Sequence, residues 1–339
     1  GDEKGTEEEA KRSLSIDKNN VTATAVLTGL YQKQKDTDKA GAALEEGIKN
    51  NPNDVSLLLL KASLYKKAKN FDKVKEAYNA LFKLKPKKVV YRHTFANILI
   101  KEEKYDEAES FIRKVITDFP DDWYSKKQLV QFLSARSGLE IAEKQIKAFM
   151  KDYPDNDDLY FWLADLYISH KDTDKAAKLL EEIVERNASN ESSLNAKTSL
   201  ARINVVKGDR SLAKKLVDAV LEKEPSHQDA LYIRASMAYD AGDYQKATTD
   251  LRTVIRDNPK AQASYQLLAE ALLIQGRTDL AIDTLGQLIE RNPTAGMAVR
   301  VRLAQMFEAN DNPEQGLAIL EMVTKAKPDY PFGWESTAR

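Results

Sequence analysis

The chain has 339 residues, of which 42% are hydrophobic and 31% are charged. This composition is too apolar for a disordered chain and too polar for a membrane protein. Lys and Arg number 52 against 53 Asp and Glu, so the net charge is −1 and a nucleic-acid-binding domain with an overall basic surplus is excluded. Because the chain has no cysteine, disulfides, thiolate metal sites and cysteine nucleophiles are excluded as well. No run approaches the roughly 20 apolar residues that span a bilayer, so we expect no membrane span.

Proline residues recur along the chain at a spacing of 34 residues, with the last one after 35. The prolines that follow this spacing are Pro52, Pro86, Pro120, Pro154, Pro225, Pro259, Pro293 and Pro328. The longer interval from Pro154 to Pro225 holds one unit of 34 residues and one of 37, with Ala188 in the slot expected for proline. A fixed period of this length predicts a repeat architecture.

Two further positions in each unit hold small side chains. The first set, eight residues into each unit, is Thr28, Ala62, Ala96, Val130, Ala164, Ala201, Ala235, Ala269 and Ala304. The second set, twelve residues before each proline slot, is Ala40, Val74, Ala108, Ala142, Ala176, Ala213, Ala247, Ala281 and Gly316. Since only small side chains let two helix backbones approach closely, we expect helices to cross at these residues.

Short polar turns such as Gly242-Asp243 separate the two small positions within a unit. A glycine after one helix, followed by an aspartate that caps the next, predicts helix–turn–helix. The flanking segments carry apolar residues at i, i+3, i+4 and i+7, as in Val74, Ala77, Tyr78 and Leu81. Each unit is therefore predicted to be an antiparallel helix pair that ends at its proline. The 37-residue unit is expected to have a longer first helix, over 191–207.

This pattern resembles that of the tetratricopeptide repeat (TPR) family, which has a large residue at position 4, Leu at 7, Gly or Ala at 8, Tyr at 11, Ala at 20, an aromatic or aliphatic residue at 24 and Pro at 32. The fifth unit supplies Tyr160, Leu163, Ala164, Tyr167, Ala176 and Leu180. The eighth unit supplies Tyr265, Leu268, Ala269, Leu272, Gly276, Ala281, Leu285 and Pro293. The resemblance implies an all-α fold, a right-handed α-solenoid of about nine 34-residue helix–turn–helix units.

The resemblance covers residues 21–330. The nine repeats are expected at 21–54, 55–88, 89–122, 123–156, 157–190, 191–227, 228–261, 262–295 and 296–330. Residues 1–20 are expected to form the second helix and turn of a truncated preceding repeat. Residues 331–339, with Trp334 at position 4, are expected to start a truncated following repeat, so we interpret the chain as a fragment of a longer TPR protein.

In the family, the first helix of each repeat lines a concave groove through positions 2, 5, 9, 12 and 13. The candidate partner-binding residues that the resemblance implies are Lys66, Lys67, His93, Asn97, Lys101, Tyr124, Lys127, Gln131, Phe161, Asp165, Arg202, Tyr232 and Tyr239. The alternative for Phe161 and Tyr232 is that they only pack between neighbouring first helices. The clamp with which some members bind a C-terminal carboxylate is not expected, because His93 and Asn97 are followed by Gln128 and Asp158 in the next repeats.

Charge is unevenly distributed, although the total is close to zero. Between Val55 and Lys104 there are thirteen basic and four acidic residues, a local surplus of nine. This surplus favours an acidic protein segment or an anionic polysaccharide as a partner, while the simpler interpretation is a set of solvated lysine-rich helix faces. Nucleic acid is not expected, because these lysines lie on several helix faces.

No residues are arranged for catalysis in the sequence. The three histidines, His93, His170 and His227, lie about two to four repeats apart, and no catalytic or nucleotide-binding motif occurs. We therefore expect a non-enzymatic chain without a cofactor that binds a protein or peptide in its groove. The alternatives are a targeting arm of a larger enzyme whose catalytic domain lies elsewhere and a self-associating scaffold.

The cellular setting is inferred from a compositional likeness alone. Bacterial TPR proteins of envelope and exopolysaccharide-export systems resemble this chain in having long runs of degenerate repeats and little cysteine. A periplasmic or envelope-associated bacterial location is therefore favoured over a cytoplasmic one.

Overall fold

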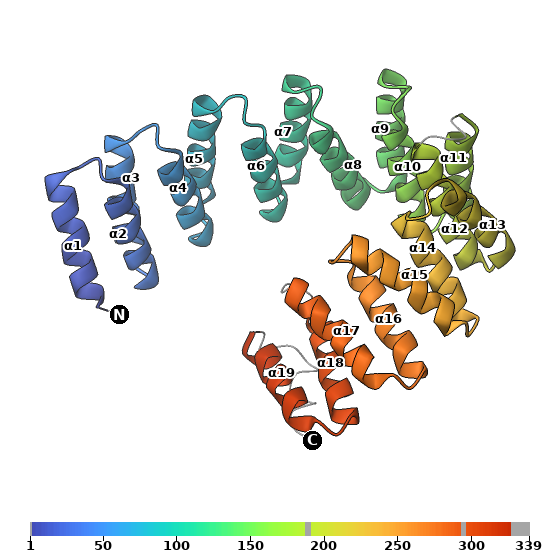
Figure 1. Cartoon of the computed structure of the whole chain (residues 1–339). Coiled ribbons are helices and arrows are strands. Elements are labelled where there is room, and N and C mark those ends of the chain that lie inside the picture. Colours follow the sequence, from blue (N-terminus) through green and yellow to red (C-terminus); the bar gives the residue numbers. More distant parts are fainter. Residues whose placement is uncertain (1, 187–190, 293–295, 327–339) are drawn as a thin grey trace. The chain divides into compact units, whose positions relative to one another are not determined.

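The computed structural model describes residues 2–186, 191–292 and 296–326, and all regular secondary structure in these ranges is α-helical (Figure 1). The helices are α1 (Glu3–Ile16), α2 (Val21–Lys33), α3 (Thr37–Asn50), α4 (Val55–Lys67), α5 (Phe71–Leu84), α6 (Val90–Lys101), α7 (Tyr105–Asp118), α8 (Trp123–Ser137), α9 (Leu139–Asp152), α10 (Asp157–Ser169), α11 (Thr173–Arg186), α12 (Glu191–Lys207), α13 (Arg210–Lys223), α14 (Gln228–Asp240), α15 (Tyr244–Asp257), α16 (Gln262–Ile274), α17 (Thr278–Arg291), α18 (Met297–Ala309) and α19 (Pro313–Ala326). The predicted all-α fold, a solenoid of helix pairs, is confirmed. Ala188, Pro293, Pro328 and the segment 331–339 lie outside the described residues.

From α2 onward the helices alternate between two roles. The even-numbered helices α2 to α18 are called the first helices here, and the odd-numbered helices α3 to α19 are called the second helices. Each first helix packs against the second helix that follows it in the pairs from α2/α3 to α6/α7 and from α10/α11 to α18/α19. The longest first helix is α12, which spans Glu191–Lys207 as expected for the 37-residue unit.

Polar side chains at fixed intervals start the helices. Asn20, Asp54 and Asp122 cap first helices and accept hydrogen bonds from backbone N–H groups of Ala23, Leu57 and Ser125. Asp36 and Asn70 cap second helices in the same way. Each cap satisfies a helix-terminal N–H group that lacks an intrahelical partner, so the 34-residue repeat of the caps fixes where the helices begin.

The turn between a first and a second helix contains one residue in the left-handed region. This residue is a glycine in some turns, as at Gly242 (φ 81°) and Gly276 (φ 72°). In other turns it is a lysine, a glutamate or an aspartate, as at Lys69 (φ 56°), Glu103 (φ 57°) and Asp311 (φ 55°). The N–H of the next residue then donates to a carbonyl five residues back, as from Asn70 to Tyr65 over 2.9 Å. This is the hydrogen bond of a Schellman-type helix end.

The small residues named from the sequence lie where helices cross. Both sets are buried throughout, from Thr28 and Ala40 in the first repeat to Ala304 and Gly316 in the last. At Gly316 the approach is so close that a Cβ atom would lie 2.8 Å from the carbonyl oxygen of Ala304. The predicted crossings are confirmed.

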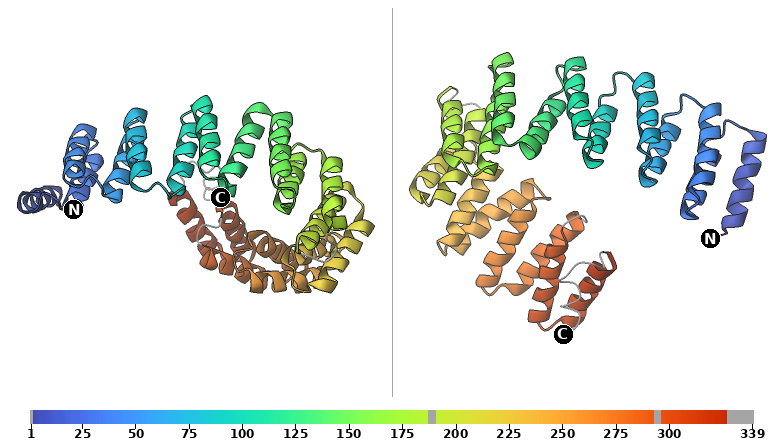
Figure 2. Two further views of the ribbon diagram at one scale, coloured as in Figure 1. Left: turned by 90° about the horizontal axis from the view of Figure 1, so that it is seen from above. Right: turned by 180° about the vertical axis from the view of Figure 1, so that it is seen from behind.

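The chain divides into two compact units, Gly1–Gln145 and Ile146–Arg339, with the boundary inside α9. In the first unit each helix from α1 to α7 packs against the helix that follows it, and in the second unit each helix from α10 to α18 does so. Figure 2 shows the first unit, in blue to green, as a row of antiparallel pairs. First helices of successive pairs also touch within a unit, as α2 with α4 and α12 with α14.

None of the helices in the described ranges combines the length and the apolar character needed to cross a bilayer.

Candidate partner-binding surfaces

The candidate residues named from the sequence all lie on first helices, and most of their side chains reach solvent. The exposed ones are Lys66, Lys67, Asn97, Lys101, Tyr124, Lys127, Gln131, Asp165 and Arg202. The partly buried ones are His93, Phe161, Tyr232 and Tyr239. Those from Lys66 to Gln131 belong to the first unit and the others to the second, and each group is described by itself.

In the first unit, a polar and aromatic cluster joins α6 to α8. The ring of His93 lies 4.2 Å from the ring of Tyr124, and His93 Nε2 lies 2.7 Å from Asp122 Oδ2. One turn further along, Gln128 donates a hydrogen bond to Asn97 Oδ1 over 2.9 Å. The structure therefore brings three candidates, His93, Asn97 and Tyr124, onto one continuous surface. We call His93, Asn97, Asp122, Tyr124 and Gln128 the α6–α8 cluster.

Asp122 and Gln128 were not among the candidates from the sequence. Asp122 is the cap of α8, and it lies 29 residues from His93 along the chain, so no local sequence signal indicates their contact. Burial acts to raise the pKa of Asp122, but hydrogen bonds from Ser125 and His93 outweigh this effect and hold the pKa below its ordinary value. Asp122 is thus an anion that orients the His93 ring and starts α8 at the same time.

In the second unit, the candidates make fewer contacts with one another. Arg202 on α12 lies 3.4 Å from Asp229 on α14, an exposed pair of little energetic weight. Tyr232 and Tyr239 pack against the hydrophobic core of α14 to α18, and the Tyr239 ring contacts Tyr244 at 5.5 Å. Part of each tyrosine side chain is therefore buried by packing. For Tyr232 this agrees with the alternative left open from the sequence, that the residue packs between neighbouring helices.

The lysine-rich segment carries less free charge than the sequence count indicates. Lys61 is only 3% exposed, and its ammonium group lies 2.9 Å from carboxylate oxygens of both Glu45 and Glu76. Lys75 pairs with Glu107 on the next second helix. Glu45 and Glu107 lie outside the counted segment, so the surplus of nine overstates the local field.

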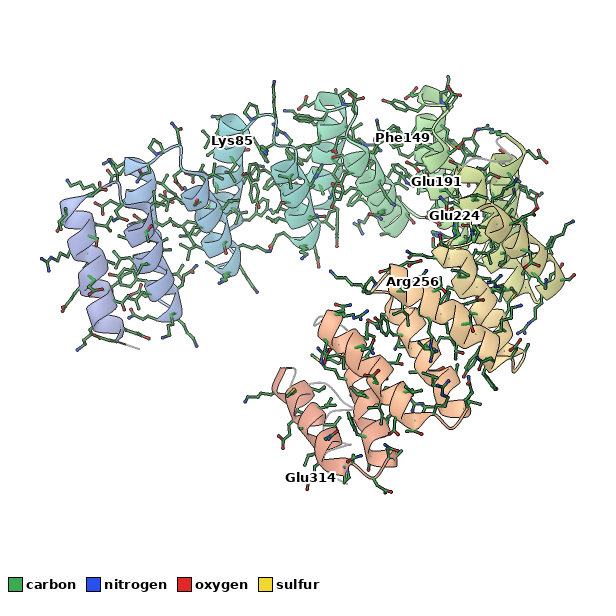
Figure 3. The ribbon with its side chains drawn as sticks, in the orientation of Figure 1. Lys85, Phe149, Glu191, Glu224, Arg256 and Glu314 are labelled. Carbon is green, nitrogen blue, oxygen red and sulfur yellow. The ribbon has the colours of Figure 1, made fainter. Side chains whose placement is uncertain are left out.

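Seven exposed lysines of this segment form two groups at opposite ends of the α4/α5 pair, and the exposed Lys101 and Lys104 lie around the end of α6. One group, Lys66, Lys67 and Lys69, lies where α4 ends. The other group, Lys83, Lys85, Lys87 and Lys88, lies around the end of α5, where Figure 3 labels Lys85. Because α4 and α5 are antiparallel, the two groups are separated by the length of a helix and form no single patch.

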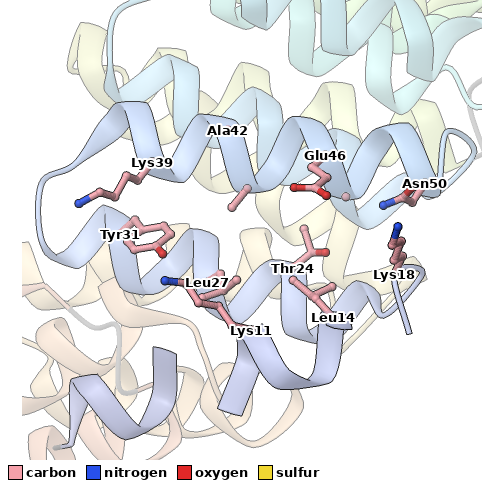
Figure 4. Close-up of a pocket in the computed structure, with 12 residues that line it drawn as sticks. Lys11, Leu14, Lys18, Thr24, Leu27, Tyr31, Lys39, Ala42, Glu46 and Asn50 are labelled. Atoms are coloured by element: carbon pink, nitrogen blue, oxygen red, sulfur yellow. The ribbon is translucent and has the colours of Figure 1, made fainter. Parts of the chain in front are cut away.

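A cavity of about 350 Å³ opens between α1, α2 and α3 (Figure 4). Its lining residues are Lys11, Leu14, Lys18, Thr24, Leu27, Tyr31, Lys39, Ala42, Ala43, Glu46, Gly47 and Asn50. None of them was a candidate from the sequence. The size lies in the range of pockets that hold small ligands.

The histidines do not assemble into a catalytic or metal site in the described part of the chain. His227 caps α14 by accepting a hydrogen bond from the N–H of Ala230, and His170 Nδ1 lies 2.9 Å from the carbonyl oxygen of Leu166. Within these ranges no three His, Asp or Glu side chains are grouped closely enough to bind a metal ion.

Comparisons with known proteins agree with the repeat pattern. Family models described as tetratricopeptide repeat match residues 142–200 and 238–298, residues 198–261, and residues 55–88. Together these matches cover more than half of the chain. A search of the curated proteins gave no match.

Solved structures with the same type of fold share little sequence with this chain. PilW, a widely conserved type IV pilus biogenesis factor, is 14% identical with a TM-score of 0.51, over 62% of this chain and 96% of PilW. A human IFIT1 dimer with m7Gppp-AAAA is 13% identical with a TM-score of 0.50, over 99% of this chain and 84% of the other. A tetratricopeptide repeat protein from Parabacteroides merdae is 14% identical with a TM-score of 0.46, over 73% of this chain and 96% of the other. At such identities the likeness concerns the fold alone.

Proposed function

Because the chain belongs to the tetratricopeptide repeat family, a family of protein-interaction scaffolds, we propose that it is a non-enzymatic scaffold that binds a protein or peptide partner on its first helices. The observation that carries this proposal is the α6–α8 cluster, where Tyr124 is 52% exposed beside His93, Asn97 and Gln128. Aromatic side chains in such settings supply much of the binding free energy at protein interfaces.

The cluster is also pre-ordered, which reduces the entropy lost on binding. His93 is held between Asp122 and the Tyr124 ring, and the amides of Asn97 and Gln128 already face each other. Lys127 and Gln131, both exposed on α8, extend the same surface with one cation and one further amide. An extended segment with an acidic residue and free backbone groups has the complementary chemistry.

A co-purification experiment tests this proposal. The double variant Tyr124→Ala/Lys127→Ala removes the aromatic anchor and the cation, and we expect at least a roughly tenfold loss of affinity for the captured partner. The matched control is Ile141→Ala/Lys114→Ala, which truncates an exposed apolar residue and a lysine on the second helices α9 and α7. Equal loss in both variants, or in neither, contradicts binding on the first helices.

We propose in addition that the partner belongs to an assembly of the bacterial envelope or of exopolysaccharide export. PilW, which shares the fold, is a type IV pilus biogenesis factor, and the two exposed lysine groups of α4 and α5 suit an acidic protein or an anionic polymer. Cell fractionation of the source organism tests the location. Binding of an acidic polysaccharide that does not weaken as the salt concentration rises contradicts the electrostatic part.

A further inference from the structure

The cavity between α1, α2 and α3 is lined by residues that depart from the repeat sequence. All second helices except α3 carry a buried apolar side chain three residues before the helix ends. These side chains are Leu81, Val115, Phe149, Ile183, Val220, Val254, Leu288 and Val323. In α3 the residue at this place is Gly47. A repeat that lacks this side chain leaves its volume unfilled unless a neighbour moves in.

A second reduction in volume lies directly opposite. Thr24 lies four residues before Thr28, the first small residue of its repeat, and the other repeats hold longer side chains at this place: Leu58, Arg92, Lys126, Tyr160, Lys197, Leu231, Tyr265 and Arg300. The two small residues face each other so closely that a Cβ atom at Gly47 would lie 2.3 Å from Thr24 Cγ2. The Thr24 side chain therefore occupies the place of the missing side chain at Gly47, and both residues line the cavity.

The floor and walls of this cavity are mostly apolar. Leu27 and the Tyr31 ring come from α2, Leu14 from α1, and Ala42 and Ala43 from α3. Since each lining segment follows one face of its helix, the cavity is a trough that runs along the helices. Figure 4 shows Lys39 and Tyr31 at one end of the trough and Lys18 and Asn50 at the other.

Charged groups at the two ends differ in whether they are already paired. At the first end, Lys11 lies 2.6 Å from Glu7, Tyr31 donates a hydrogen bond to the same carboxylate, and Lys39 lies 3.0 Å from Asp36.

At the second end, Lys18 has no carboxylate within ion-pair distance among the described residues. The amide of Asn50 lies beside it. Glu46 lines the middle of the trough and disfavours a second anion there. The trough thus combines an apolar body with one available cation at one end.

We propose that this trough binds a small amphiphilic carboxylate, with its apolar part between α1 and α3 and its acid group at Lys18 and Asn50. Burial of the apolar part against Leu14, Leu27 and Ala43 supplies the binding free energy, and the lysine sets the orientation. This site is separate from the α6–α8 cluster, so it does not depend on the partner proposed above.

Calorimetric titration of the full chain with sodium octanoate tests the proposal, with octylamine as the oppositely charged probe. Ala42→Leu fills the trough from an exposed position on α3 and is expected to weaken octanoate binding at least tenfold, while Ala135→Leu, which adds the same side chain on α8, leaves it unchanged. Ala43→Leu is a second filling variant. Lys18→Gln is expected to weaken binding severalfold, and the matched Lys49→Gln on α3 has no effect.

Three results overturn the proposal. The first is that octanoate does not bind the unaltered chain. The second is that octanoate binds the folded Ala42→Leu and Ala43→Leu variants as tightly as the unaltered chain, with folding verified by circular dichroism. The third is that octylamine binds as tightly as octanoate, because the site would then not select for an acid group.

Discussion

The ammonium group of Lys61 lies 2.9 Å from the carboxylate of Glu76, although only 4% of the lysine side chain is exposed. The same ammonium group lies 2.9 Å from Glu45, so one cation on α4 joins carboxylates on the second helices before and after it. At the corresponding place in α2, α8 and α10 the chain has buried leucines, Leu27, Leu129 and Leu163. The second repeat therefore replaces an apolar contact by an ionic one.

Removing the carboxylates is expected to destabilise the chain more than removing the lysine. The double variant Glu45→Gln/Glu76→Gln leaves a buried ammonium group without a compensating charge, which costs about 3 kcal/mol. Adding Lys61→Leu to this variant is expected to recover most of the loss, because the site then matches its leucine-containing equivalents. Urea denaturation monitored by circular dichroism gives the free energies of unfolding. A triple variant no more stable than the double variant would show that the lysine itself is required.

Acid is expected to weaken the same contact. Hydrogen bonding to Lys61 is the main cause that lowers the pKa of Glu76 below its ordinary value of 4.5. A carboxylate whose pKa is lower in the folded state contributes stability above the unfolded pKa, and this contribution disappears as the pH falls through the folded pKa. The difference in unfolding free energy between the unaltered chain and Glu76→Gln should therefore be present at about pH 7 and shrink at about pH 3.

The control for this pH series is Glu140→Gln, which changes an exposed glutamate on α9. Its effect on unfolding should be small at either pH. A difference for Glu76→Gln that stays constant from neutral to acidic pH would mean that the ion pair does not contribute to stability.

These contacts show which features the sequence could and could not predict. The helix pairs follow from signals that act locally, because a proline, a cap such as Asp54 or a small residue such as Ala62 specifies the backbone around itself. The contact of Lys61 with Glu45 joins two repeats, and a count of charges along the chain cannot pair residues on different helices. His93 was selected for its position on a first helix, but its contact with Asp122 joins residues 29 apart on different helices and has no local signal in the sequence.

The cavity is a different case, because the signal was in the sequence and depended on comparing the repeats with one another. Gly47 and Thr24 are unremarkable residues in isolation. Their small size stands out only when they are compared with Leu81 and Leu58, the equivalent residues of the next repeat. The comparison also requires knowing that Gly47 and Thr24 face each other in the structure. In this chain the residues that recur in every repeat predict the fold, and the residues that differ from the other repeats at the same place mark the cavity.

In the turns between first and second helices, substitutions at two equivalent residues are expected to change the stability of the chain in opposite directions. Gly242 has a φ of 81°, where an L-residue is disfavoured by about 1–2 kcal/mol, so Gly242→Ala should destabilise the chain although no atom lies within 4 Å of the added Cβ. Lys69 has a φ of 56°, so Lys69→Gly relieves strain and should stabilise by up to about 1 kcal/mol, once the greater entropy of unfolded glycine is counted. Thermal midpoints that fall for both variants would contradict this account of the turn.

Close contact between α18 and α19 gives the last prediction. A Cβ atom at Gly316 would lie 2.8 Å from the carbonyl oxygen of Ala304, and backbone cannot move aside as a side chain can. Gly316→Ala should therefore push α19 away from Val301 and Ala304 on α18, at a cost of roughly 1–3 kcal/mol. Faster amide hydrogen exchange in α18 and α19 would record the loosened contact.

The matched control is Gly286→Ala on α17, where no atom lies within 4 Å of the new Cβ. In a helix interior, alanine is favoured over glycine by about 0.5–1 kcal/mol, so this variant should slow exchange in α17. The same chemical change is thus expected to act in opposite directions on neighbouring helix pairs. Slower exchange in α19 of Gly316→Ala would mean that the two backbones do not touch at this glycine, and that the added alanine acts only through its higher helix propensity.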